Sequence, residues 1–421
     1  MNGYTLRKDL KLGVATAATQ IEGEDKNNTW YRWPKDGTKT KDGSSSIQGN
    51  MHWKNYRAHI DLMSEMGLEI YRMSLEWSRI EPEEGHFCNE AMSHYIDEIN
   101  YLKEKGIDVL VTLHHFSNPL WFDDLGGFDS PDSVRCFTEY AEYVAENLKG
   151  LVTSFCTINE PNVYATSCFL LGEWINEEKD FMKLLRIYRN MAKCHTETYS
   201  LIHRIIPEAE VGIALNINHF FPLRKNSLFD RIGCFFYDRG FHTALTYAMG
   251  YGKLIFPLGF TKKKGEFFDF FGMNYYTSNA VKGAQRITLP EWPANNLGWG
   301  ITPWGFKEEL ERFHKMFPDK PVYITENGTC DRDDHFRARY IYDHLKVITE
   351  LPYVKRYYHW TFMDNFEWAQ GTTARFGLVK YNYEDDTYEV RKSGHFYSEI
   401  IEKRCIDQEM IEKYDIGEYH D

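Results

Sequence analysis

The feature of this sequence that most constrains its fold is an alternation of short apolar runs with helix-like patterns along one uninterrupted chain. The runs lie at 13–20, 69–77, 108–116, 152–160, 210–218, 269–277, 321–327 and 354–365. Most of them are apolar on both faces, which is typical of parallel strands covered by helices. Eight strands alternating with helices predict an α/β fold, a single (β/α)8 TIM barrel with its active site at the C-terminal ends of the strands.

A doubly wound sheet is the alternative fold, because it also alternates strands with helices. Such sheets usually contain fewer strands and carry a glycine-rich turn after the first one. The segment "ATQIEGE" at 18–24 covers the end of the first run and the residues just after it. It contains no GxGxxG pattern. The barrel therefore accounts for the sequence better than the doubly wound sheet.

Helical patterns between the runs predict the helices that cover the barrel. The segment 55–67 is apolar on one side and stops at Gly67, a typical C-terminal cap. A second helix is predicted at 132–150, with Asp132 as its N-cap, and a third at 333–350.

No linker, low-complexity segment or change of composition divides the chain, so we predict one domain spanning 1–421. The acidic stretch 406–421 lies beyond the last motif. It could pack on the barrel, take part in a subunit contact or be mobile, and the sequence leaves a homo-oligomer open.

Charge and hydropathy restrict the partners of the chain. Its net charge of −13 disfavours a nucleic-acid partner, because such proteins show a basic stripe. No apolar run approaches the roughly 18 to 20 residues that cross a bilayer, so no membrane partner is expected. The N-terminus lacks a signal-like run and the eight cysteines are scattered without a CxxC pair, which predicts reduced thiols and a cytoplasmic location.

Polar and aromatic residues gather where the predicted strands end, and in a barrel those ends form one functional rim. They are Gln20, Arg72 with Glu76, His115, Asn159 with Glu160, Asn274 with Tyr276, Glu326, and Trp360 with Glu367 just beyond. A lone carboxylate at a strand end is usually a helix cap or part of a salt bridge. Here Glu160 and Glu326 end the fourth and seventh strands and can face each other across the ring. Two carboxyl groups about 5 to 5.5 Å apart cleave glycosidic bonds with retention of configuration.

Five ordered motifs carry a resemblance to a known family. They are "LHHF" (113–116), "TINEP" (157–161), "FGMNYYTS" (271–278), "YITENG" (323–328) and "WTFMDNFEWAQG" (360–371). These motifs resemble the signatures of glycoside hydrolase family 1, the β-glucosidase family, and the similarity runs from near residue 16 to residue 397. The resemblance implies a retaining β-glucosidase without cofactor or metal, with Glu160 as acid/base and Glu326 as nucleophile.

The resemblance also implies the neighbours of the two carboxyl groups. It places Arg72 and Tyr276 beside Glu326, where a cation and a hydroxyl keep a nucleophile ionised. It assigns Asn159 to the sugar 2-hydroxyl. Burial and the charge of its partner should raise the pKa of Glu160, so that it stays protonated until Glu326 is esterified.

The substrate-binding residues follow from the same resemblance. They are Gln20, His115, Phe116, Asn159, Asn274, Trp299, Trp360, Glu367, Trp368 and Phe376. Trp360 forms the floor under the sugar, and Trp299 stacks on the leaving group. His114 beside His115 could suggest a metal pair, but adjacent strand residues point to opposite faces, so no metal is expected.

Glu367 indicates which sugars are bound. Relatives that prefer 6-phosphorylated sugars carry serine there, with lysine and tyrosine seven and nine residues later, where this chain has Ala374 and Phe376. A carboxylate repels phosphate and Ala374 offers no cation, so we predict neutral β-D-glucosides or short β-linked oligosaccharides as substrates, with β-D-galactosides and β-D-fucosides also accepted. A 6-phospho-β-glycosidase and a non-catalytic sugar-binding homologue are the alternatives, and transfer of the sugar to an alcohol stays open.

Two departures from the family pattern concern the edge of this pocket. Phe116 stands where the family usually has tryptophan, which removes an indole N–H near the sugar. The segment between Tyr276 and Trp299 is short, and a short loop could open the leaving-group site to varied acceptors.

Overall fold

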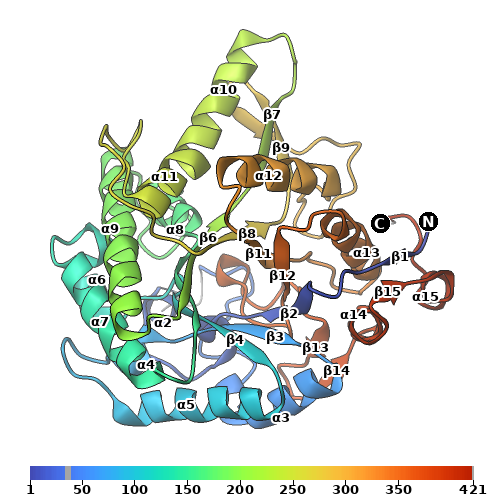
Figure 1. Cartoon of the computed structure of the whole chain (residues 1–421), viewed down its shortest axis with the longest axis horizontal. Coiled ribbons are helices and arrows are strands. Elements are labelled where there is room, and N and C mark those ends of the chain that lie inside the picture. Colours follow the sequence, from blue (N-terminus) through green and yellow to red (C-terminus); the bar gives the residue numbers. More distant parts are fainter. Residues whose placement is uncertain (34–38, 420–421) are drawn as a thin grey trace.

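The computed structural model describes residues 1–33 and 39–419 and has a closed barrel of parallel strands at its centre (Figure 1). The barrel strands are β2 (Lys11–Ala15), β3 (Ile70–Ser74), β4 (Asp108–His114), β5 (Ser154–Asn159), β6 (Glu210–Asn216), β8 (Phe270–Tyr275), β11 (Val322–Asn327) and β12 (Val354–Trp360). Their order around the ring is β11, β12, β2, β3, β4, β5, β6 and β8, so successive runs of the sequence are neighbours. The predicted (β/α)8 barrel is confirmed.

The barrel closes because its strands are buried on both faces and approach each other closely. Every residue of β3, β5, β8 and β11 is buried. Gly13 shows the tightness of the contact, because a Cβ there would lie 1.7 Å from the carbonyl oxygen of Ile70 on β3. The register places Asn274 of β8 opposite Glu326 of β11, which brings two predicted site residues together.

Helices surround the barrel and follow the predicted pattern. The longer ones are α3 (His52–Glu65), α5 (Asn89–Glu104), α7 (Ser133–Leu148), α9 (Phe181–Ile205), α10 (Leu228–Asp238), α11 (Ala244–Tyr251), α12 (Pro303–Met316), α13 (Arg337–Thr349) and α14 (Lys392–Lys403). The helices expected at 55–67, 132–150 and 333–350 are α3, α7 and α13, and Gly67 has the positive φ, 73°, of a C-terminal cap. Asp132 does not cap α7 with its side chain, since its backbone is already helical rather than extended (φ −83°, ψ −6°).

Short helices lie in the segments that follow the barrel strands. They are α1 (Ala18–Ile21), α2 (Thr29–Arg32), α4 (Trp77–Ile80), α6 (Leu120–Asp124), η1 (Gly127–Asp129), α8 (Pro161–Thr166), η2 (Ser167–Leu171), η3 (Arg239–Thr243) and η4 (Trp368–Gln370). The first predicted strand, 13–20, is therefore too long, because β2 ends at Ala15 and Gln20 lies on α1.

Two features beyond the barrel were not expected from the sequence. The strands β7 (His219–Pro222), β9 (Ser278–Lys282) and β10 (Gln285–Ile287) form a small sheet, and α10 stands beside it at the top of Figure 1. A second pair, β13 (Val379–Tyr381) and β14 (Tyr388–Val390), forms a hairpin.

The C-terminal stretch packs on the rest of the chain. There β15 (Cys405–Ile406) pairs with β1 (Tyr4–Thr5), and α15 (Gln408–Lys413) buries Met410. The part of the expected 406–421 extension at 420–421 lies outside the described residues. Among the residues that the structure describes, no helix has both the length and the apolar character needed to span a bilayer.

Candidate active site

A cavity of about 760 Å³ opens where the barrel strands end. Its lining includes these predicted site residues: His115, Phe116, Glu160, Tyr276, Trp299, Glu326, Trp360, Glu367, Trp368 and Phe376. The other predicted residues, Gln20, Arg72, Asn159 and Asn274, are fully buried beneath that lining. Glu76 is also buried, but Ser117 and Ser78 donate hydrogen bonds to its carboxylate, and it does not line the cavity.

Glu326 lies near the end of β11 and is bonded on both carboxylate oxygens. Arg72 Nη1 donates to Oε1 at 2.6 Å, and the Tyr276 hydroxyl donates to Oε2 at 2.6 Å. Burial raises the pKa of Glu326 above its ordinary value, while the Arg72 cation and the Tyr276 hydroxyl oppose that rise. Because both contacts are made with the charged form, they favour ionisation of Glu326 over that of other carboxyl groups in the cavity.

Glu160 follows β5 directly and has different surroundings. Within the described part of the chain its carboxyl group accepts hydrogen bonds from neutral amides, Asn216 Nδ2 at 3.0 Å and Asn274 Nδ2 at 2.8 Å, both to Oε1. Burial first, and the charge of Glu326 second, raise its pKa to about 8. The shift has the direction expected from the sequence, and it leaves Glu160 mostly protonated at neutral pH.

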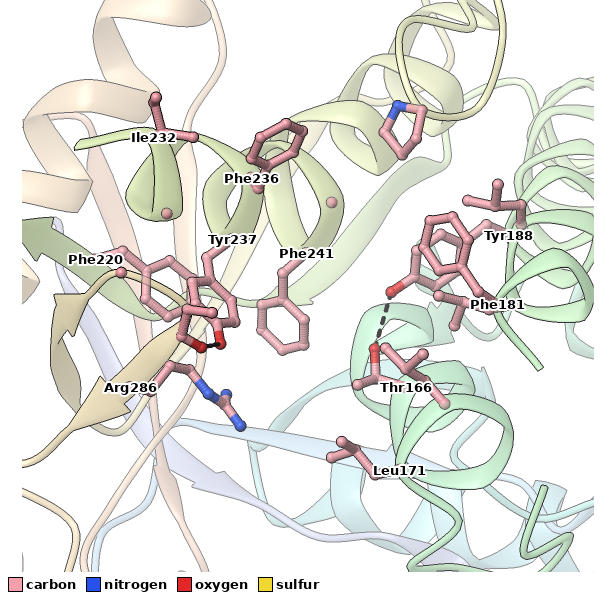
Figure 2. A pocket seen from close by; sticks show the side chains of 18 of the residues that line it. Thr166, Leu171, Phe181, Tyr188, Phe220, Ile232, Phe236, Tyr237, Phe241 and Arg286 are labelled. Carbon is pink, nitrogen blue, oxygen red and sulfur yellow. Dashed lines mark hydrogen bonds between the residues drawn. The ribbon is translucent and has the colours of Figure 1, made fainter. Parts of the chain in front are cut away.

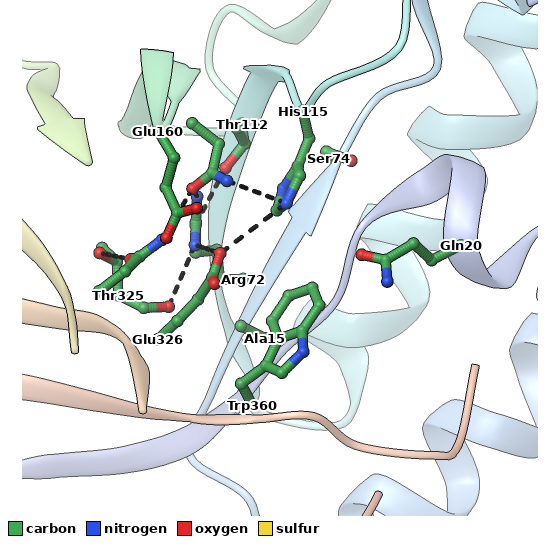
Figure 3. A network of polar contacts seen from close by, with 12 residues as sticks. Ala15, Gln20, Arg72, Ser74, Thr112, His115, Glu160, Thr325, Glu326 and Trp360 are labelled. Atoms are coloured by element: carbon green, nitrogen blue, oxygen red, sulfur yellow. Dashed lines mark hydrogen bonds and ion pairs between the residues drawn. The ribbon is translucent and has the colours of Figure 1, made fainter. Parts of the chain in front are cut away.

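A chain of hydrogen bonds joins the two carboxyl groups beneath the cavity (Figure 3). Arg72 contacts Glu326 through Nη1 and donates through Nη2 to Asn159 Oδ1 at 2.7 Å. The same oxygen accepts from Asn274 Nδ2 at 3.0 Å, and that amide also reaches Glu160. The two carboxyl groups therefore belong to one hydrogen-bond network, which their positions at the ends of the fourth and seventh strands did not by themselves predict.

Two buried polar atoms near this network have no hydrogen-bond partner among the described residues: Gln20 Oε1 and His115 Nδ1. His115 Nε2 lies 3.0 Å from Asn159 Nδ2, an amide donor, which assigns the imidazole proton to Nδ1. Gln20 uses its amide nitrogen on the Phe366 carbonyl at 2.7 Å, which leaves Oε1 as an acceptor. Unpaired buried groups of this kind suit the hydroxyl groups of a polar ligand.

Aromatic rings form the walls of the cavity. The Trp360 ring lies 5.7 Å from His115, and its indole N–H donates to Glu367 Oε1 at 3.2 Å. Trp368 lies 5.2 Å from Phe116, whereas Trp299 stands at the outer edge and is 37% exposed. Flat apolar surfaces next to directed polar groups are typical of small-molecule sites.

Three residues that line the cavity have left-handed backbone conformations, which residues other than glycine rarely adopt. They are Phe116 (φ 68°), Glu160 (φ 40°) and Trp368 (φ 53°). Each such residue costs of order 1 to 3 kcal/mol, and residues of this kind gather at functional sites. At Glu160 this geometry turns the chain from β5 into α8, whose first residue is Pro161.

The structure adds two residues that the sequence did not single out. Asn216, at the end of β6, donates a hydrogen bond to Glu160. It could have been found by the rule that identified the other site residues, since it is also a polar residue at the end of a predicted strand. Trp174 packs 5.1 Å from Phe116 and lies in a loop without periodicity, so no pattern indicated it. As expected, the side chains of His114 and His115 point in different directions. His115 lines the cavity, whereas His114 does not, and His114 Nε2 lies 2.9 Å from Asn118 Oδ1.

The model of glycosyl hydrolase family 1 matches residues 3–235 and 260–406 of this chain. The chain belongs to this family. It is a glycoside hydrolase, and the part of the chain that matches the family contains Glu160, Glu326 and the hydrogen-bond network between them.

Individual family members cover nearly the whole chain. Beta-glucosidase A of Acetivibrio thermocellus is 30% identical over 95% of this chain and 99% of its own. The family 1 β-glucosidase of Thermotoga maritima has a TM-score of 0.90 at 26% identity, covering 97% of this chain and all of its own. It has been solved in complex with glucoimidazole and with galacto-hydroximolactam. A β-glycosidase from Pyrococcus horikoshii gives 0.89 at 31% identity, covering 99% of each chain.

Proposed function

We propose that this family 1 hydrolase removes non-reducing terminal β-D-glucosyl residues by a retaining double displacement. The observation that carries this proposal is the unequal surroundings of two carboxyl groups in one network. Glu326 is bonded by a cation and a hydroxyl, whereas Glu160 is bonded by neutral amides and has its pKa raised to about 8. Such a pair supplies an ionised nucleophile and a protonated acid at the same pH.

In the first step Glu326 attacks the anomeric carbon and forms a covalent glycosyl ester. The glycosidic bond breaks at the same time, and the leaving oxygen takes the proton of Glu160. Asn159, held by Arg72 and Asn274, presents its amide to the sugar 2-hydroxyl, a contact that strengthens as positive charge develops.

In the second step water replaces the leaving group. Esterification removes the charge of Glu326, which had helped to raise the pKa of Glu160. The pKa of Glu160 therefore falls, and its carboxyl group stays ionised after it has given its proton to the leaving group. It then takes a proton from the water, the water oxygen attacks the anomeric carbon, and Glu326 is released as a carboxylate.

The remaining pocket residues suit an unmodified hexose. Gln20 Oε1 accepts and His115 Nδ1 donates, Glu367 holds a third hydroxyl, and Trp360 lies under the apolar face of the ring. Galactosides and fucosides fit the same set, and the galacto-configured complex of the Thermotoga maritima relative supports that breadth.

A 6-phospho-β-glycosidase is the second candidate, and two observations favour it. Burial raises the pKa of Glu367 to about 8, so it is mostly neutral near pH 7 and repels phosphate less than its sequence position suggested. Lys41 lines the cavity, and its backbone N–H donates to the Ala369 carbonyl at 3.0 Å. Against this candidate, Ala374 is fully buried and offers no cation.

Rates on nitrophenyl β-D-glucoside and on its 6-phosphate separate the two candidates. We expect kcat/KM to favour the neutral glucoside by at least about tenfold, because a phosphate loses its hydration in the pocket and Ala374 supplies no cation to replace it. Faster turnover of the phosphate, lost in Lys41→Ala, would assign the site to phosphoglycosides. No turnover of either compound would point to sugar binding without catalysis.

The pH dependence of kcat/KM tests the assignment of the acid. Glu160 must be protonated to act, so kcat/KM should fall as pH rises through about 8. Glu326 must be ionised, and its raised pKa places the acidic limb above the usual range of glutamate. The alkaline limb should vanish in Glu160→Gln when the leaving group is acidic enough to depart without protonation. Survival of that limb in the variant would assign it to another group.

A further inference from the structure

The helix α10 exposes its apolar side to solvent instead of burying it. One face of this helix carries large apolar residues at intervals of three and four: Leu228, Phe229, Ile232, Phe235 and Phe236. All of them are exposed, and Phe229 reaches 76%. A helix on the surface of a globular protein normally turns such a stripe towards the core, so α10 has the opposite orientation.

The other face of α10 holds the helix on the small sheet. Gly233 lies so close to the turn between β9 and β10 that a Cβ there would be 1.9 Å from the Gly283 carbonyl oxygen. Asp230 accepts from the Gly283 N–H at 2.9 Å, and the Tyr237 hydroxyl donates to the Ala284 carbonyl at 2.6 Å. A rotation of α10 that buried the apolar stripe would break these contacts, so the stripe is held facing outward.

The apolar stripe also stays uncovered on the side of α9. A cavity of about 600 Å³, the apolar cavity, lies there and is lined mostly by apolar side chains. Figure 2 shows Ile232 and Phe236 of α10 on one side of it and Phe181 of α9 on the other. Phe181 and its neighbour Met182 are themselves exposed, so the apolar surface continues beyond α10.

A loop after α11 extends this surface. It carries Phe256 and Phe260, and Phe260 is 88% exposed. The ring centroid of Phe256 lies 6.2 Å from that of Phe236 on α10. We call the exposed apolar side chains of α10 and of this loop the apolar face. Contiguous exposed apolar surface of this kind usually marks an interaction site.

The residues around the apolar face are basic, although the whole chain carries a net charge of −13. Between positions 224 and 264 there are eight lysines and arginines but only two acidic residues, Asp230 and Asp238. Both of these carboxylates already form ion pairs with arginines. Four basic residues are exposed and form no ion pair within the described part of the chain: Lys225, Arg231, Lys262 and Lys264. A partner that complements this region must be apolar and also carry negative charge.

A bilayer with anionic headgroups has both properties. Phenylalanine and leucine side chains enter the boundary between headgroups and acyl chains, while lysines and arginines attract the anionic headgroups. Such a helix lies in the plane of the surface, so docking requires no membrane-spanning run. A second copy of this chain fits less well, because a two-fold dimer through the apolar face would place the same basic residues opposite one another.

We propose that the apolar face and the basic residues around it dock this protein on the surface of a bilayer that contains anionic phospholipids. The inference goes beyond the proposed function and does not rest on it, because the residues of the apolar face lie outside the catalytic cavity.

Co-sedimentation with lipid vesicles tests the charge requirement. The wild type should bind vesicles of equimolar phosphatidylcholine and phosphatidylserine at least about tenfold more tightly than vesicles of phosphatidylcholine alone, and salt should weaken the binding. Lys262→Ala with Lys264→Ala should lower the partition coefficient about fivefold for each lysine removed. Lys8→Ala with Lys149→Ala is the matched control, because it removes the same charge from exposed positions outside the basic region. This control should bind like the wild type.

Phe229→Ser with Phe260→Ser tests the apolar contribution. Both side chains are mostly exposed, so the protein should fold normally, while vesicle binding should fall at least about tenfold. Leu125→Ser is the control, since Leu125 is also exposed but lies beside α6. Circular dichroism should be unchanged in all these variants. Vesicle binding is measured without turnover, so failure of the proposed function would leave this test intact.

Two results would overturn the inference. One is a wild type that does not bind the anionic vesicles, or that binds them no better than Lys262→Ala with Lys264→Ala. The other is a stable dimer, measured by light scattering, that Phe229→Ser with Phe260→Ser separates into monomers. That result would assign the apolar face to a second copy of the chain.

Discussion

Glu326→Gln is expected to lower kcat on nitrophenyl β-D-glucoside by at least about 10⁵-fold, the scale seen when a covalent nucleophile is lost. The amide cannot form the glycosyl ester. Its oxygen keeps the bond from Arg72, which now reaches Oε1 at 2.6 Å, and its NH2 takes the place of Oε2 and donates to the Tyr276 hydroxyl, which now donates to the carboxylate at 2.6 Å. The variant should therefore keep the fold of the pocket while it loses the nucleophile. Initial rates together with circular dichroism measure the two effects separately.

Glu104→Gln is the matched control for this substitution, because it makes the same change on the exposed surface of α5. It should retain wild-type turnover. A slow fluorinated glucoside should leave its sugar on Glu326 in the wild type, and peptide mass spectrometry locates the modified residue. Label on any other carboxylate, or turnover in Glu326→Gln close to the wild type, would remove Glu326 from the nucleophile role.

Glu160→Gln is expected to cost about 10² to 10⁴ in kcat on substrates with poor leaving groups, the usual contribution of a general acid. Substrates with acidic leaving groups should lose much less in the first step, because they depart without a proton. Their glycosyl ester should then accumulate, since no base activates water. Azide needs no base, so added azide should restore turnover and give the β-glycosyl azide, measured by NMR of the product.

The configuration of that azide also tests retention. Two inversions, one by Glu326 and one by azide, return the β-anomer. Azide should not restore Glu326→Gln in the same way, because no ester forms there. If azide restored Glu326→Gln to give the β-azide and left Glu160→Gln inactive, the two roles would be exchanged.

The sequence was sufficient for the barrel, because parallel strands buried on both faces leave a direct record as apolar runs. It was also sufficient to place Glu160 and Glu326 on one rim, since the C-terminal ends of barrel strands meet there. The helix end at Gly67 followed in the same way from a local rule, whereas the cap at Asp132 failed because its backbone is helical.

The tertiary structure decided what depends on contacts between distant segments. The bond from Asn216 to Glu160, the raised pKa of Glu367 and the position of Lys41 arise from the packing of separate loops, which no local pattern records. The apolar cavity arises likewise, since α9, α10 and the turn between β9 and β10 are far apart in the chain. The sequence by itself therefore determined the barrel and the positions of its two carboxyl groups, because local periodicity and strand ends encode them. Only the tertiary structure decided the raised pKa of Glu367 and the cavities beside the strand ends, because burial and cavities exist only once distant segments have packed together.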